Sequence, residues 1–316
     1  MDLLDTGIFR ELITDVPNRC LQPDIKKSYI LIAKKLGTTE DTVRNRVRWL
    51  HDRGIVRGWK LGVNPTLFGY QTCYLFFDSP SGREKYEVLG KLRRISGILW
   101  IVDYFGDFTG FLISYKDEET LERKLEPVSS ILESNAYIRV NNQFPRVRTS
   151  LTNTDWSIIG ALANDPRKSY ADIATELRIS SRMAKRRLRM MIEERAFFIF
   201  PDIDVSKVEG RTVVSLVAFY SDSKLKREDE ETTLAKFGDF FVMTPSPEPS
   251  YGAYIFMLPN LPTAERLFTF VSGLKGVRNA SVRLIVDFIN LLDRAFESEL
   301  REKGIEKPTT QPRSTT

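Results

Sequence analysis

The sequence contains one pattern twice, 141 residues apart. Residues 27–36 align with residues 168–177 at six identical positions out of ten, and the register continues as far as Gly69 and Gly210. Upstream of this segment the offset becomes 150, because the first copy has nine extra residues around Val16 to Ile25. Self-similarity at a fixed period predicts repeated structural units. A chain of 316 residues therefore folds as two related units of about 150 residues each.

Each unit is predicted to begin with three helices. In the first unit the third helix places Val43, Val47 and Leu50 on one buried stripe, at the i, i+4, i+7 spacing of a core-facing helix. Gly37 ends the helix before it and Thr39 caps the third helix, so the connection is a tight turn. Two helices joined in this way form a helix-turn-helix.

The second unit repeats the arrangement, with Ser180 as the cap and Ala184, Leu188 and Met191 as the stripe. In the first unit Gly54 stops the third helix, and residues 55–63 are predicted to form a short hairpin, the wing.

The remainder of each unit alternates strands and helices in the order β-α-β-β-α-β. Strands are predicted in the first unit at 70–78, 98–105, 109–115 and 137–141, with helices at 83–95 and 118–134. In the second unit they fall at 212–220, 240–244, 252–258 and 281–287, with helices at 228–237 and 262–274. This order is that of the ferredoxin-like fold, in which two helices cover one face of a sheet. The predicted fold class is α+β, with two winged helix-turn-helix domains and two ferredoxin-like βαββαβ domains arranged as an internal pseudo-dimer.

The predicted domain boundaries follow from these elements. The helix-turn-helix domains occupy 1–66 and, in degraded form, 149–208; the ferredoxin-like sensing domains occupy 67–148 and 209–290; a C-terminal helix at 291–306 and a disordered tail at 307–316 complete the chain.

Positive charge is concentrated in the two third helices. Residues 34–60 and 178–195 each carry a net charge of +5, whereas the rest of the chain sums to −5. Two basic segments on an otherwise acidic protein indicate two contacts with a polyanion. Solvated helix faces and a protein-interaction module are the alternatives that the charge alone leaves open.

The outward faces of these helices carry residue types suited to duplex DNA. Arg and Asn make paired hydrogen bonds to base edges, and hydroxyls at helix N-termini hold phosphate. Arg57 and Lys60 on the wing are expected to reach the flanking backbone. The predicted DNA-binding residues are Thr39, Thr42, Arg44, Asn45, Arg48, Arg57, Lys60, Ser180, Ser181, Arg182, Lys185, Arg186 and Arg189. The third helix of the first unit is expected to discriminate between DNA sequences. The third helix of the second unit, with four outward cations, is expected to bind mainly phosphate.

The segments 32–39, 43–50 and 54–56 resemble the DNA-binding domain of Lrp/AsnC regulators, and the α+β part looks like the effector-sensing domain of the same family. The resemblance implies a transcriptional regulator whose two halves form a covalent pseudo-dimer. It also implies a small-molecule effector, such as an amino acid, held by the loop residues Gly106, Asp107, Phe108 and Gly110. The other interpretation of this loop is a plain β-turn.

The predicted architecture also resembles that of siroheme decarboxylases, which offers an enzymatic alternative. They use histidines in the sheet domain, whereas His51, the one histidine here, falls on the first DNA-reading helix. We therefore expect no catalytic residues, and the sequence shows no spacing for a metal site and no cofactor motif.

Two cysteines and the lack of a basic, then apolar, leader indicate a cytoplasmic protein, and no segment is long and apolar enough for a membrane span. The expected partners are double-stranded DNA, a small effector and further copies of the chain, joined through the sheet domains or the C-terminal helix.

Overall fold

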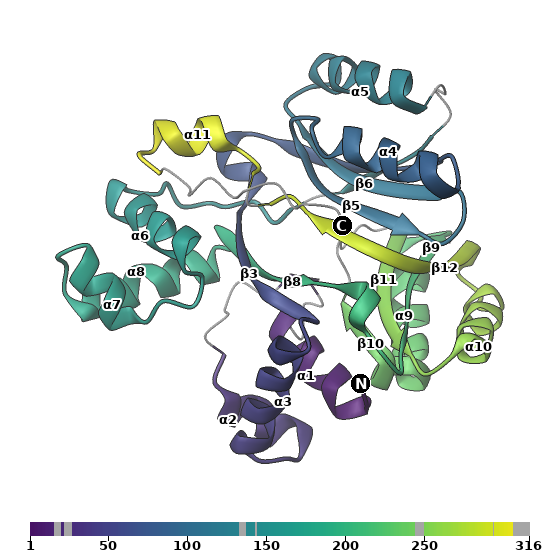
Figure 1. Ribbon diagram of the computed structural model, residues 1–316, viewed down its shortest axis with the longest axis horizontal. Helices are drawn as coiled ribbons and strands as arrows, with labels where there is room; N and C mark the ends of the chain where they lie inside the picture. Colours follow the sequence, from purple (N-terminus) through teal and green to yellow (C-terminus); the bar gives the residue numbers. More distant parts are fainter. Residues whose placement is uncertain are drawn as a thin grey trace.

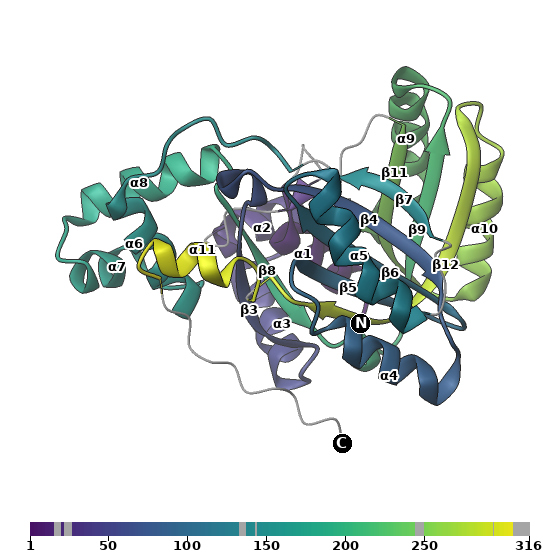
Figure 2. The same ribbon diagram turned by 90° about the horizontal axis from the view of Figure 1, so that it is seen from above.

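The computed structural model describes residues 1–15, 20–21, 27–132, 137–142, 144–243, 250–292 and 294–305. The same order of elements occurs in both halves: three helices, one strand, and then a βαββαβ module (Figure 1). The sheets and their covering helices lie together, and in Figure 1 the first three-helix unit lies below them and the second to the left. Figure 2 shows the second unit projecting from one side of the molecule. The fold class is therefore α+β with two winged helix-turn-helix units and two ferredoxin-like modules, as the sequence predicts.

The three-helix units start where local capping allows. The first contains α1 (Leu3–Ile13), α2 (Tyr29–Leu36) and α3 (Glu40–Asp52). The second contains α6 (Asn153–Asn164), α7 (Tyr170–Glu176) and α8 (Ser181–Glu193). Thr39 and Ser180 cap α3 and α8 through their side-chain oxygens, as predicted. The predicted stripes on both helices are buried.

A short strand pair, β1 (Thr14–Asp15) with β2 (Cys20–Leu21), follows α1 only in the first unit. It lies at the nine-residue insertion, most of which is outside the described residues.

The predicted wing is not a local hairpin. Residues 56–63 form a single strand, β3 (Val56–Val63), which pairs antiparallel with β8 (Phe197–Ile203) of the other half. We call this two-stranded sheet the hinge ladder. Its backbone groups find partners about 140 residues away rather than in a local turn, so each half supplies the strand that the other half needs.

The first ferredoxin-like module has strands β4 (Gln71–Asp78), β5 (Ile98–Tyr104), β6 (Phe108–Tyr115) and β7 (Ile138–Asn142), with helices α4 (Gly82–Leu92) and α5 (Glu118–Leu132). The second has β9 (Thr212–Tyr220), β10 (Phe241–Met243), β11 (Tyr251–Leu258) and β12 (Val277–Asn290), with α9 (Ser223–Phe237) and α10 (Leu261–Ser272). Helix α9 starts five residues earlier than predicted, because Asp222 caps it by accepting from Lys224 and Leu225. Three 3-10 turns, at Pro65–Phe68, Val205–Lys207 and Gly238–Phe240, link the elements.

One long strand joins the two modules into a single sheet. The strand order is β10-β11-β9-β12-β5-β6-β4-β7. The first part of β12 pairs with β9, and after a register shift at Ile285 to Asp287 its last part pairs with β5. The prediction of a strand at 281–287 is thus too short, because β12 continues far enough to serve both modules.

The open faces of the two sheets face each other, as predicted for the pseudo-dimer. The largest apolar cluster includes Tyr74, Trp100 and Leu112 of the first module and Val213 and Met257 of the second. The helices α4 and α5 cover the other face of the first module and α9 and α10 that of the second, each over its own apolar cluster.

The predicted C-terminal helix at 291–306 is largely wrong. The backbone N–H of Leu291 still bonds the carbonyl of Leu99, and Asn290 accepts from Leu292, so the chain leaves the sheet in a turn. Helix α11 covers only Glu297–Glu302 and follows Phe296, which has a left-handed φ of 60°. The predicted disordered tail at 307–316 lies outside the described residues. Among those residues, no helix is both long and apolar enough to cross a membrane.

The two helical units are attached differently. Helix α1 lies against the edge strand β10, where Arg10 donates to the Gly238 carbonyl at 2.7 Å and Thr14 to the Val242 carbonyl at 2.6 Å. In the second unit, Trp156 of α6 instead stacks on Phe68 at 5.6 Å between ring centroids. Helix α1 of the first unit therefore contacts the second sheet module directly, whereas α6 of the second unit packs on the turn at Pro65–Phe68.

Candidate nucleic-acid interface

Helix α3 turns its polar face to solvent. Asp41, Arg44, Asn45 and Arg48 are all exposed, opposite the buried stripe. Arg44 is not free, because it pairs with Glu40 and lies 3.4 Å from Asp41. The Thr39 and Thr42 hydroxyls are 2.8 Å apart at the N-terminus, and the Thr42 amide donates to Thr39.

Helix α8 presents a more strongly cationic face. Arg182, Lys185 and Arg186 are exposed and form no ion pair with the residues that the structure describes. Arg189 pairs with Glu193 at 2.8 Å. Because both side chains are exposed, this ion pair contributes little to the stability of the fold. Ser180 is occupied as the cap, bonding the Met183 amide at 3.1 Å, whereas Ser181 is exposed at the first turn.

Two left-handed residues mark where the second unit departs from the first. Gly37 and Gly54, which flank α3, have φ values of 65° and 66°. At the corresponding positions around α8, Arg178 and Arg195 have φ values of 54° and 55°. The turns are the same, but in the second unit side chains occupy a backbone conformation that suits glycine. The extra arginines therefore add charge at some cost in backbone energy.

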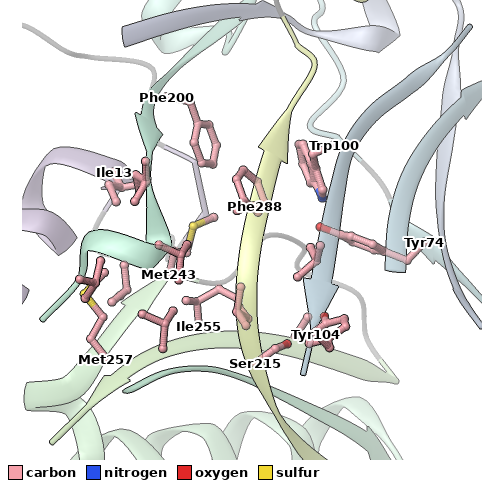
Figure 3. A pocket seen from close by; sticks show the side chains of 18 of the residues that line it. Ile13, Tyr74, Trp100, Tyr104, Phe200, Ser215, Met243, Ile255, Met257 and Phe288 are labelled. Atoms are coloured by element: carbon pink, nitrogen blue, oxygen red, sulfur yellow. The ribbon is translucent and has the colours of Figure 1, made fainter. Parts of the chain in front are cut away.

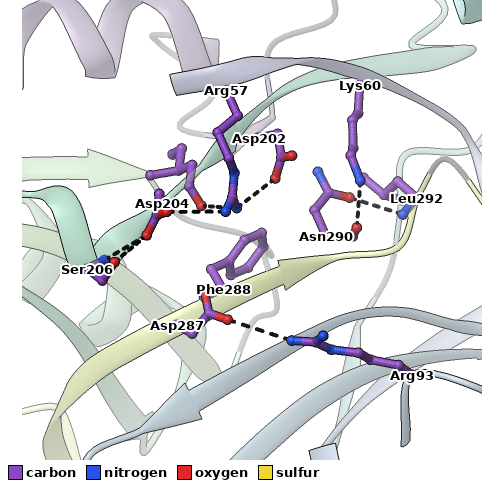
Figure 4. Close-up of polar contacts among 11 residues, drawn as sticks. Arg57, Lys60, Arg93, Asp202, Asp204, Ser206, Asp287, Phe288, Asn290 and Leu292 are labelled. Atoms are coloured by element: carbon purple, nitrogen blue, oxygen red, sulfur yellow. Dashed lines mark hydrogen bonds and ion pairs between the residues drawn. The ribbon is translucent and has the colours of Figure 1, made fainter. Parts of the chain in front are cut away.

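Arg57 and Lys60 do not lie on a hairpin. They belong to the hinge ladder, where Arg57 pairs with Asp202 at 3.2 Å and Asp204 at 3.3 Å. Lys60 donates to the carbonyl of Asn290 at 3.0 Å, as Figure 4 shows. Both cations therefore have partners within the chain although Arg57 is exposed and Lys60 partly exposed, and their contact with DNA stays a prediction.

A buried carboxylate anchors the first unit. Glu11 on α1 has no exposed side-chain surface and pairs with Lys27 and, at 2.7 Å, with Lys35. Burial alone would raise the pKa of Glu11, but the hydrogen bonds from the two lysines outweigh it and the pKa is lowered. These contacts hold together α1 and α2, the two helices that precede α3.

The predicted effector residues divide into two groups. Gly106 and Asp107 form an exposed turn between β5 and β6, whereas Phe108 and Gly110 are buried on β6. Gly110 has no room for a side chain, because a Cβ would lie 2.7 Å from the Phe76 ring. The four residues are therefore adjacent but face different surroundings.

A buried lysine that the sequence analysis does not identify supports this turn. The Lys85 ammonium lies 2.7 Å from Asp103 and donates to the carbonyls of Gly106 at 2.7 Å and Phe108 at 3.0 Å. The sequence gives only a weak indication that Lys85 is buried, because a single lysine on a predicted amphipathic helix is normally taken to lie on the exposed face.

Sequence comparison with known proteins matches parts of the chain. A winged helix-turn-helix DNA-binding family matches residues 151–195, which is the unit predicted to be degraded. The HTH-type transcriptional regulator Ptr1 of Methanocaldococcus jannaschii is 33% identical over 110 residues, covering 34% of this chain and 73% of that protein. The HTH-type transcriptional regulator LrpA of Pyrococcus horikoshii is 34% identical over 73 residues, covering 23% of this chain and 52% of the relative.

Among solved structures, the siroheme decarboxylase NirDL superposes with a TM-score of 0.53, covering 96% of this chain and 98% of that one. At 15% sequence identity the superposition shows a shared fold and no more.

Proposed function

This chain belongs to the Lrp/AsnC family of HTH-type transcriptional regulators, and from that premise we propose that it is a tandem fusion in which two non-identical helix-turn-helix units read one duplex. The observation that supports this proposal best is the exposed face of α8, where Arg182, Lys185 and Arg186 form no ion pair among the described residues. Three such cations on one helix attract the phosphate backbone. The same proposal includes a cytoplasmic location and domain boundaries after residues 66, 148, 208 and 290.

The two helices are proposed to have different roles. Helix α3 combines Asn45 and Arg48, which suit adenine and guanine edges, with Arg44 held by its own acidic neighbours. Helix α8 offers cations without acids beside them in its first two turns. We therefore assign base discrimination to α3 and phosphate binding to α8.

The test is a mobility-shift titration of the full chain with a pool of random duplexes, run from low to moderate salt. Binding should weaken steeply with salt, because arginine–phosphate contacts displace counterions. The variant with Arg182, Lys185 and Arg186 all changed to Gln should bind at least about tenfold more weakly. A matched variant with Arg83, Lys91 and Arg94 changed to Gln loses the same charge from the α4 region and should bind almost as wild type. Equal losses in both variants would contradict the assignment.

The fold shared with NirDL leaves a tetrapyrrole enzyme as the second proposal. The apolar cavity between the sheets has a volume of about 80 Å³. An apolar cavity of about 150 Å³ takes a single benzene ring, so the space here does not suit a macrocycle of four pyrroles. Incubation of the protein with siroheme, followed by absorbance, tests this directly: an unchanged spectrum argues for the regulator.

A further inference from the structure

The interior between the two sheets contains an apolar cavity, which we call the inner chamber. It has a volume of about 80 Å³, and its walls are almost wholly apolar. Figure 3 shows Trp100 and Tyr74 on one side of β12 and Met243 and Ile255 on the other. Both sheet modules therefore contribute walls to one space.

A second cavity of about 140 Å³, the outer chamber, adjoins the first. The two share Phe76, Tyr104 and Ser215 as wall residues. The rim of the outer chamber includes Ile138, which is 53% exposed. The shared residues thus connect an apolar interior with a space that reaches the surface.

Arg283 is the cation of the outer chamber. It lies on β12 with its guanidinium carbon 3.5 Å from the centroid of the Phe108 ring, and it makes no ion pair with any described residue. Stacking uses the face of the guanidinium and leaves its N–H donors at the edges available. No carboxylate side chain lines either chamber within the described part of the chain.

Polar groups in the walls are few, and among them the hydroxyls of Tyr104 and Ser215 hydrogen-bond to each other. The Tyr74 hydroxyl is buried, points toward Trp100, and has no well-formed hydrogen bond in the described residues. Tyr104 and Ser215 bring hydroxyls to the junction, next to Arg283. Apolar walls with a few convergent polar groups are typical of small-molecule sites.

We propose that the two chambers form one binding site for a small carboxylic acid with an apolar ring or chain, its carboxylate at Arg283 and its apolar part reaching from the outer chamber past the shared wall residues into the inner one. Neither chamber alone reaches the roughly 150 Å³ that takes a benzene ring, so a ring has to use the space of both. Arginine suits a carboxylate because its planar fork donates two parallel hydrogen bonds. A free amino acid fits less well, because its ammonium group would meet no carboxylate in the walls.

The site also touches the elements that carry the recognition helices. Phe200 and Ile203 of the hinge ladder and Ile13 of α1 line the inner chamber. Its role as an effector site rests on the proposed function, whereas ligand binding itself is measured without DNA.

Isothermal titration calorimetry of the full chain with phenylacetate tests the proposal. Saturable binding is expected with a Kd on the order of 1 mM or tighter. The Arg283→Gln variant should raise the Kd at least about tenfold, and so should Ala253→Leu, which reduces the inner chamber. Arg278→Gln, on the same strand but outside both cavities, should leave the Kd unchanged.

Two further probes sharpen the result. L-phenylalanine and benzyl alcohol should each bind more weakly than phenylacetate, because one adds an unpaired ammonium and the other lacks the carboxylate. Absence of saturable binding for both phenylacetate and hexanoate would overturn the proposal, as would a Kd indifferent to Arg283→Gln. DNA binding without ligand, measured separately, decides the proposed function whatever these titrations show.

Discussion

Arg187 binds Asp155 through two parallel hydrogen bonds, from Nε to Oδ1 at 2.8 Å and from Nη2 to Oδ2 at 2.6 Å. Because Asp155 is fully buried on α6, the pair fixes the recognition helix α8 to the first helix of its unit. The first unit has the same relationship between Arg46 and Asp5, with longer contacts of 3.3 and 3.4 Å. Each recognition helix therefore reserves one inward arginine for position.

Replacing Arg187 should destabilise the protein while leaving the cationic face intact. In Arg187→Gln the buried carboxylate of Asp155 loses its partner, which should cost about 2 kcal/mol of unfolding free energy, less than a fully buried pair because Arg187 is 24% exposed. Urea unfolding measures the difference. Arg186→Gln, one position away and exposed, should stay within about 0.5 kcal/mol of wild type; a similar loss in both would contradict the positioning role.

Relieving the left-handed residue before α8 should stabilise the second unit. Arg178→Gly removes a side chain from a backbone with a φ of 54°. The relief of backbone strain in the folded state should outweigh the conformational entropy that glycine adds to the unfolded state, for a net increase of about 0.5 kcal/mol in the free energy of unfolding. The control, Arg182→Gly within α8, should instead lose about 1 kcal/mol. Thermal unfolding of the two variants should show shifts of opposite sign, and a destabilised Arg178→Gly would refute the strain argument.

Acid should weaken the attachment of α1. The lowered pKa of Glu11 means that its ionised form is stabilised by folding, so this contribution is present above the ordinary pKa of 4.5. It is lost as pH falls through the lower, folded-state value. Between pH 5 and pH 3 wild type should therefore lose more unfolding free energy than Glu11→Gln, which has no such carboxylate. Parallel pH profiles for the two proteins would exclude this linkage.

The turn between β5 and β6 should depend on Lys85. In Lys85→Met the buried Asp103 loses the ammonium 2.7 Å away, and the expected loss of stability is about 3 kcal/mol. Lys91→Met, exposed on the same helix, should change stability by no more than about 0.5 kcal/mol. Adding Asp103→Asn to Lys85→Met should recover part of the loss, because the unpaired charge is then removed. No recovery in the double variant would count against the ion pair.

The two recognition helices should differ in what a single substitution does to DNA binding. Arg186→Ala should weaken binding alike on all duplexes and reduce the salt slope by about 1, as expected for one lost phosphate contact. Asn45→Ala should instead relax preference at one base position. Selection from a random duplex pool with each variant separates the outcomes, and a loss confined to one position for Arg186→Ala would reverse the assignment.

The sequence predicts the helical units well because their determinants are local. Thr39 and Ser180 are recognised as caps, and Val43, Val47 and Leu50 as a buried stripe, from residues within one or two turns of each other. Exposure of Arg48 and Arg186 follows from the same periodicity.

Strand partners are not local, and there the predictions fail. The pattern of residues 56–63 indicates an extended strand but carries no information on its partner, so it predicts only the nearest possible pairing, a hairpin. The structure pairs it instead with residues 197–203, supplied by the other half of the chain. Similarly, the strand around Arg283 is recognisable, yet neither its extension to Asn290 nor its pairing with β5 follows from its residues.

The amino-acid order alone therefore determined two helix-turn-helix units, their outward charge and the strand-helix order of two modules, since each depends on neighbours a few residues apart. Only the tertiary structure decided that the halves exchange strands in the hinge ladder, that β12 belongs to both sheets, and that Arg283 meets Phe108 beside an apolar cavity. Contacts between residues more than a hundred positions apart are selected by packing and backbone pairing over the whole molecule, which no short segment specifies.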